Sequence, residues 1–96
     1  MKKLLCVVKP FKVDAVVRAL TEAGAASVTL TEARGYGRQK GHLDLYRDDP
    51  GRVSFLPKVR IECVVEDAEL KRAVEAATTA ARTGRIGDGK IIVEEA

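Results

Sequence analysis

Residues 58–84 read KVRIECVVEDAELKRAVEAATTAARTG, and the spacing of apolar residues changes once within this stretch. In its first half apolar side chains occupy every second position: Val59, Ile61, Cys63 and Val65. That alternation is typical of a strand with one face in a core. In its second half Leu70, Val74 and Ala77 follow the spacing of one helix face, and Gly84 suits a cap after the helix. The stretch therefore predicts a strand, then a helix, then a turn.

The N-terminal part of the chain shows the same order of patterns. The run KLLCVVKPF is apolar and is closed by Pro10, which predicts a central strand at about residues 3–8. In KVDAVVRALTEAG, which ends at Gly24, apolar residues have helical spacing: Val13, Val16, Val17 and Leu20. In ASVTLTEAR, Val28 and Leu30 alternate with polar residues and predict a half-buried strand. A last short strand is predicted at KIIV.

The predicted order β–α–β–β–α–β indicates one α+β domain over residues 1–96. A four-stranded antiparallel sheet with two helices on one face, the ferredoxin-like arrangement, satisfies this order. The handedness rule for β-α-β connections makes the first and third strands central neighbours. Leu5, Val7 and Val64 would then lie on the sheet face without helices. An exposed apolar sheet face is expected to be buried against a partner, most simply another copy of the chain.

Composition narrows the function only moderately. Of 96 residues, 46% are hydrophobic and 32% charged, and the net charge is +3. This mildly basic mixture suits anionic small molecules as well as nucleic acid. No apolar run approaches the roughly 20 residues of a membrane span, so we expect a cytoplasmic protein. Cys6 and Cys63 lie in apolar runs without metal-ligand spacing, and we expect buried free thiols.

The regular pattern is lost between Gly35 and Pro57. This segment contains glycine, proline, aromatic and basic residues without a sustained period. Its LDLY and VSF segments would fit a loose hairpin around the DDPG turn. Because long irregular loops in small domains are usually functional or disordered, we expect an arm that docks onto a partner.

The segment RTGRIGDGK, residues 82–90, leaves two interpretations open. It is not a Walker A motif, because its glycines follow a helix and lead into a strand. In the first interpretation, the glycines only cap the preceding helix and form the turn that follows it. Alternatively, backbone N–H groups would converge on a phosphate, with Arg82, Arg85 and Lys90 as counter-charges.

Four motifs resemble the PII nitrogen-regulatory signalling proteins. In chain order they are VKPFKVDAV, VTLTEARGYGRQKGH, FLPKVRIE and TGRIGDGKIIV. The resemblance covers residues 1–95 and implies a homotrimer of ferredoxin-like subunits. It also implies ATP or ADP in the clefts between subunits, with Mg²⁺ and 2-oxoglutarate beside the nucleotide. The long loop, at about residues 37–55, would dock on a target protein.

The resemblance carries site residues onto this chain. For the nucleotide it implies Val7, Thr29, Gly37, Arg38, Gln39, Glu62, Val64, Arg85, Ile86, Gly87, Asp88, Gly89 and Lys90. For 2-oxoglutarate it implies Lys9, Gln39, Lys40, Gly41 and Lys58, and Gln39 would also meet the nucleotide-bound Mg²⁺. Tyr46 and Arg47 match the part of the loop that reaches toward a partner. In transporter-binding members that arginine enters the mouth of an ammonium channel.

Two departures from the family pattern affect the expected function. Gly51 stands where many bacterial members carry a uridylylated tyrosine, so we expect no uridylylation of this loop. The sequence ends at Ala96, whereas typical members continue with two arginines that reach the phosphates, so triphosphate binding is expected to be weaker. The alternative function is therefore a divergent PII-like sensor of ADP or AMP, bicarbonate or metal ions. Such a sensor would act on a different transporter or an efflux pump.

Other protein classes fit less well. An RNA-recognition module shares the predicted fold order, but its third strand carries aromatic residues and KVRIECVV has none. For an enzyme, the sequence offers one histidine, His42, and no nucleophile–histidine–acid set. We expect a protein that is not an enzyme, with at most slow ATP hydrolysis in which Asp88 and Gln39 orient water.

Overall fold

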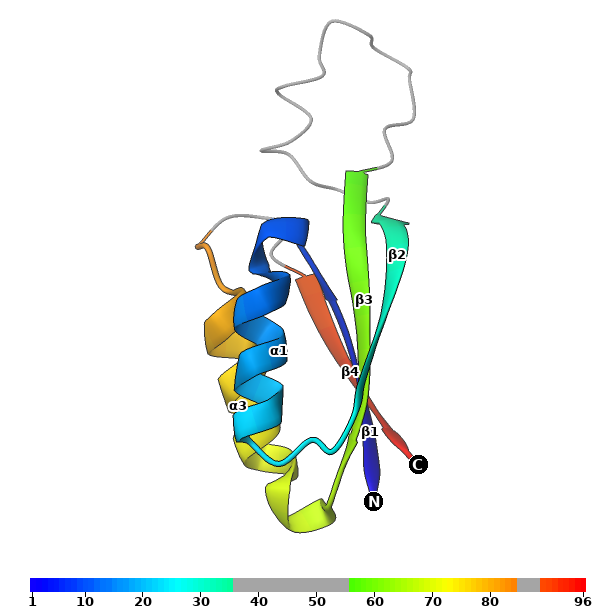
Figure 1. Ribbon diagram of the computed structural model, residues 1–96, viewed down its shortest axis with the longest axis vertical. Helices are drawn as coiled ribbons and strands as arrows, with labels where there is room; N and C mark the ends of the chain where they lie inside the picture. Colours follow the sequence, from blue (N-terminus) through cyan, green and yellow to red (C-terminus); the bar gives the residue numbers. More distant parts are fainter. Residues whose placement is uncertain (36–55, 85–88) are drawn as a thin grey trace, which may run out of the picture.

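The computed structural model describes residues 1–35, 56–84 and 89–96, and the intervening segments 36–55 and 85–88 lie outside this description. The predicted hairpin around DDPG falls among the latter. Figure 1 shows two helices covering one face of a twisted sheet. The described elements, in chain order, are β1 (Lys2–Val8), η1 (Pro10–Lys12), α1 (Val13–Glu22), β2 (Val28–Gly35), β3 (Leu56–Val65), η3 (Asp67–Glu69), α3 (Leu70–Ala81) and β4 (Gly89–Glu95).

The sheet has the strand order β2-β3-β1-β4, and its neighbouring strands are antiparallel. The prediction that the first and third strands are central neighbours is therefore confirmed. Val8, near the end of β1, pairs with Val59 of β3 on one side and with Gly89 of β4 on the other. With two helices on one face, this is the ferredoxin-like α+β fold that the sequence predicts.

The core lies between the sheet and the helices. The buried strand residues on this face are Leu4, Cys6, Val8, Ile61, Cys63 and Val65. Val16 and Leu20 of α1 pack against them, as their helical spacing predicts. Leu30 was expected to be half-buried, but 51% of it is exposed, since β2 is an edge strand.

The buried stripe of α3 differs from the prediction. Its fully buried residues are alanines spaced by four, Ala73, Ala77 and Ala81, whereas Leu70 and Val74 are only partly buried. Small side chains on this stripe allow α3 to approach α1 and the sheet closely. Sequence reasoning identified Ala77 but missed the other two alanines, because it gave more weight to large apolar residues.

The helix ends also test the sequence predictions. Gly24 follows the C-cap residue of α1 with φ +108°, and its N–H donates to the Thr21 carbonyl at 3.1 Å, as the glycine-stop prediction requires. In α3 the prediction was wrong. The C-cap residue is Arg82, whose backbone is already extended, and Gly84 lies two residues further on with φ +82°.

The strands that flank residues 36–55 come closer to this segment than predicted: β2 ends at Gly35 and not at Arg34, and β3 begins at Leu56 and not at Lys58. Pairing between β2 and β3 continues to Gly35 and Leu56, and it includes Pro57 opposite Arg34. A proline lacks the backbone N–H of a sheet ladder, so it is tolerated near the start of a strand.

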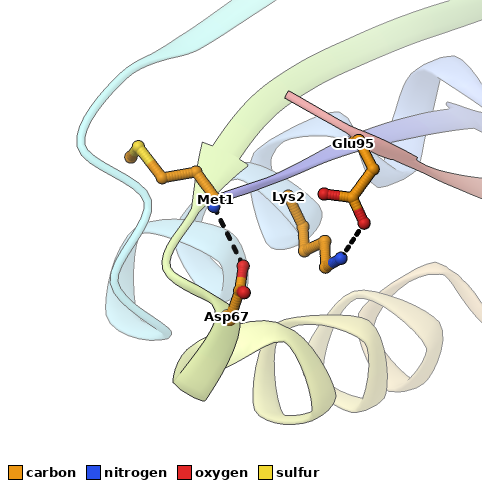
Figure 2. A network of polar contacts seen from close by, with 4 residues as sticks. All are labelled: Met1, Lys2, Asp67 and Glu95. Atoms are coloured by element: carbon orange, nitrogen blue, oxygen red, sulfur yellow. Dashed lines mark hydrogen bonds and ion pairs between the residues drawn. The ribbon is translucent and has the colours of Figure 1, made fainter.

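At one end of the sheet, polar contacts join the start of β1 to η3 and to the end of β4 (Figure 2). The N-terminal ammonium of Met1 lies 3.0 Å from Asp67, and Lys2 at the start of β1 pairs with Glu95 at the end of β4. This ammonium group lowers the pKa of the Asp67 carboxyl, mainly by hydrogen bonding. The Glu95 carboxylate raises the pKa of Lys2 in the same way.

Candidate nucleotide and effector site

The two segments that the sequence assigns to ligand binding leave the sheet at one end. Gly35 and Leu56, which bound residues 36–55, are paired with each other. Gly89, which follows residues 85–88, pairs with Val8. Because Val8 also pairs with Val59, three residues from Leu56, both segments adjoin the same end of the central strands. We call this end of the sheet, at which β2 ends and β3 and β4 begin, the loop end (Figure 1).

Two nearly buried lysines lie at the loop end. Lys9 follows Val8 of β1, and Lys58 precedes Val59, to which Val8 is paired. Only 6% of Lys9 and 5% of Lys58 are exposed. Lysines are almost never buried to this degree without compensating interactions. The pair places two basic side chains at the loop end, which suits a small anion.

Lys9 also connects β1 to the segment after α3. Its ammonium group lies 3.4 Å from the hydroxyl oxygen of Thr83, to which it donates a hydrogen bond. Thr83 immediately precedes Gly84 and the RIGD segment. The sequence analysis did not single out Thr83. Its place beside the glycine-rich segment was the one signal that could have drawn attention to it.

Gly89 has a structural requirement that the sequence did not reveal. Its φ is +129°, and a Cβ atom at this position would lie 2.0 Å from the carbonyl oxygen of Val7. No side chain fits there without moving β4 away from β1. Gly89 was predicted to cradle phosphate, and the structure shows that close strand approach alone already demands glycine here.

A second group of predicted residues lies further along the sheet. Thr29 of β2 pairs with Glu62 of β3, and Val64 lies two residues beyond Glu62 on the same face. The Glu62 carboxylate accepts from Arg60 at 2.8 Å and lies 3.9 Å from the Lys3 ammonium. These contacts hold the carboxylate on the face away from the helices.

The register places most of the described site residues on the same sheet face. Val7 is opposite Arg60 on one side and Lys90 on the other, and Leu5 is opposite Glu62. This is the face away from the helices, which confirms the prediction that Leu5, Val7 and Val64 lie outside the core layer.

One chain does not bring all these residues together. Lys58 and Val64 are six residues apart on β3, which corresponds to roughly 20 Å of strand. The loop-end lysines and Gly89 therefore form one group, and Thr29, Glu62 and Val64 form another. A small ligand cannot contact the far ends of both groups in a single copy.

Several predicted site residues lie outside the described residues. They are Gly37, Arg38, Gln39, Lys40, Gly41, Tyr46, Arg47, Arg85, Ile86, Gly87 and Asp88. Within residues 1–35, 56–84 and 89–96, no group of three or more histidine, cysteine, aspartate or glutamate side chains is placed to hold a metal ion. Over the same residues, no helix is long and apolar enough to cross a membrane.

The described residues define a ferredoxin-like α+β protein with two nearly buried lysines at the loop end of its sheet. Comparison with known proteins is more specific. The family model for nitrogen regulatory protein P-II matches residues 1–95. Nitrogen regulatory protein P-II from Rhodospirillum rubrum is 59% identical over 93 residues, which cover 97% of this chain and 83% of the relative. The protein of the same name from Azospirillum brasilense is 58% identical, and that from Pasteurella multocida 50%, with the same coverage. The chain belongs to the P-II nitrogen regulatory protein family.

Proposed function

We propose that this protein is a signalling regulator that binds an adenine nucleotide and 2-oxoglutarate in clefts between the subunits of a homotrimer. Residues 37–55 then act on a target protein, for which an ammonium channel is the first candidate. Family membership supports the regulatory class, and the described geometry supports the anionic ligands.

The observation that carries the proposal is the pair of buried lysines at the loop end. A dicarboxylate beside a polyphosphate concentrates negative charge, and nearby cations offset it. Lys58 and Lys9 offer two ammonium groups with fixed positions, since both are almost fully buried. The 3.4 Å contact from Lys9 to Thr83 links this place to the segment proposed to hold phosphate.

The distribution of site residues supports a cleft between subunits. The lysine group and the group of Thr29, Glu62 and Val64 are separated along β3. Two neighbouring copies can bring the loop end of one chain against the second group of another. The sheet face that carries both groups also carries apolar residues, with Ile92 43% exposed. Burying that face between copies would stabilise a closed oligomer.

Signal transmission follows from differential binding. Nucleotide state, together with Mg²⁺ and 2-oxoglutarate, would favour one shape of residues 37–55, and a target that prefers this shape responds. A divalent cation would supply charge neutralisation between the phosphates and the oxo-acid, with Gln39 as the proposed contact. We place this regulator in the cytoplasm and assign it no catalytic role beyond at most slow ATP hydrolysis.

Isothermal titration calorimetry on the full chain tests the proposal. ATP with Mg²⁺ is titrated first, and ATP is then repeated with saturating 2-oxoglutarate. We expect 2-oxoglutarate to tighten ATP binding. In Lys58→Met we expect this enhancement to fall by about tenfold or more, because a charge-assisted contact is lost.

Lys71→Met is the matched control, since it removes the same charge from an exposed position on α3. If 2-oxoglutarate has no effect on the wild type, the effector assignment is wrong. If only ADP or AMP binds, the divergent sensor is favoured, and bicarbonate and metal ions become the next ligands to titrate. If no nucleotide binds, the proposed ligand class as a whole is rejected.

A further inference from the structure

A cavity of about 330 Å³ lies on the helix side of the sheet, near its loop end. Its walls come from α3, β1 and β4. Cys6 and Val8 of β1 belong to the core face, and Ile91 of β4 is paired with Cys6. The cavity is therefore on the helix side of the sheet, and it shares only Gly89 and Lys90 with the predicted nucleotide residues.

The amino-acid sequence explains why a cavity forms here. The residues of α3 nearest the sheet include Ala77 and Ala81, whose short side chains leave space beside the edge strand β4. Val93 on β4 also lines the cavity and remains 43% exposed. A larger residue in place of either alanine would fill part of this volume.

The lining combines an apolar wall with positive charge. Val74, Ile91 and Cys6 are among the apolar residues. Burial raises the pKa of the Cys6 thiol to about 11, so the thiol is neutral and adds to the apolar wall. Arg82, after the end of α3, supplies the positive charge, whereas Lys90 pairs with Val7 and its side chain belongs to the other sheet face. Among the described residues that line the cavity, none is acidic.

We propose that this cavity binds a small amphipathic carboxylate, with the apolar tail against α3 and β4 and the carboxylate at Arg82. A cavity of about 150 Å³ is enough for benzene, so this one accommodates a chain of roughly eight carbons. Guanidinium groups bind carboxylates through paired hydrogen bonds, which favours Arg82 as the head-group contact.

The site is separate from the proposed effector site in its chemistry and in its position. The loop-end lysines, Lys9 and Lys58, do not line the cavity. Only Gly89 and Lys90 are shared with the predicted nucleotide residues. The proposal does not depend on nucleotide binding.

Octanoate titrated into the full chain, followed by methyl NMR, tests the proposal. We expect saturable shifts of the Val74, Ala77 and Ile91 methyl signals. Octanol has the same tail without charge, and acetate has the head group without the tail, so both should bind at least tenfold more weakly. Arg82→Gln should weaken octanoate binding about three- to tenfold, because a cation at the cavity is removed.

Lys71→Gln removes the same charge from an exposed position on α3 outside the cavity lining, and it should leave octanoate binding unchanged. Octanoate shifts that do not saturate, or that fall on other methyl groups, overturn the proposal. Equal affinity for octanol, or an equal effect of the two variants, overturns the carboxylate contact at Arg82. If the cavity methyls respond to protein concentration and not to octanoate, a second copy of the chain covers the cavity and the proposal is wrong.

Discussion

Substitution of Gly89 by alanine tests the close approach between β4 and β1. The structure assigns two separate costs to this change. The φ of +129° strains any residue with a Cβ by about 1–3 kcal/mol. The new Cβ would also lie 2.0 Å from the Val7 carbonyl oxygen, so the first residues of β4 must move away from β1. Losing two ladder hydrogen bonds adds about 2 kcal/mol, for a total of about 3–5 kcal/mol.

Gly84→Ala separates the two costs. Gly84 also has a positive φ, +82°, but nothing lies within 4 Å of a Cβ added there. Its substitution should therefore cost only the backbone strain, about 1–2 kcal/mol. Guanidinium unfolding followed by circular dichroism, at equal protomer concentration, gives both free energies of unfolding. If Gly89→Ala loses no more stability than Gly84→Ala, the reasoning about strand approach is refuted.

Two further predictions concern the sheet face without helices and the N-terminus. Ile92→Asp should dissociate the proposed trimer in light-scattering measurements, because Ile92 pairs with Leu5 on the face away from the helices. Val93→Asp is the matched control, since Val93 is equally exposed at 43% but lies on the opposite face; equal dissociation by both would contradict the assignment of the interface. The Met1 ammonium lowers the Asp67 pKa below its ordinary 3.8, so this pair should stabilise the fold above that value and lose its contribution as pH falls through the lowered pKa. Asp67→Asn should therefore be slightly less stable at pH 7 and no less stable at pH 2; a deficit that persists at pH 2 would contradict the ion-pair explanation.

The sequence predicted the elements whose apolar spacing is regular. Alternation along Val59–Val65 identified β3, and the continuous run in β1 identified a strand with neighbours on both sides. The end of α3 was misplaced because Gly84 looks like a helix cap, whereas the backbone becomes extended at Arg82. Residue type alone does not distinguish a glycine that caps a helix from a glycine in the turn that follows.

The candidate site was predictable from motif resemblance and much less so from residue chemistry. Nothing in KPFK or LPKV indicates that Lys9 and Lys58 are nearly buried, because lysines are usually solvated. The pairing of Val8 with Val59 brings the two lysines to the same end of the sheet, although they are far apart in the sequence. The close approach at Gly89 likewise depends on Val7, which lies more than eighty positions earlier in the sequence. Contacts of this kind require the pairing of strands that are distant in the sequence, and the local spacing of apolar residues does not specify that pairing.

The strand order also has a consequence for how this chain folds. β1 precedes the other described strands in the sequence, yet both of its neighbours come much later, and Lys2 is paired with Glu95. Closing loops of this length is entropically costly before native contacts compensate, so topologies dominated by distant pairings fold slowly. During synthesis both edges of the apolar strand KKLLCVV are covered only after β4, which begins more than eighty residues after β1 ends, has been made. β1 has two open edges until β3 has been made and one open edge until β4 follows, and an open apolar edge can mispair with another chain.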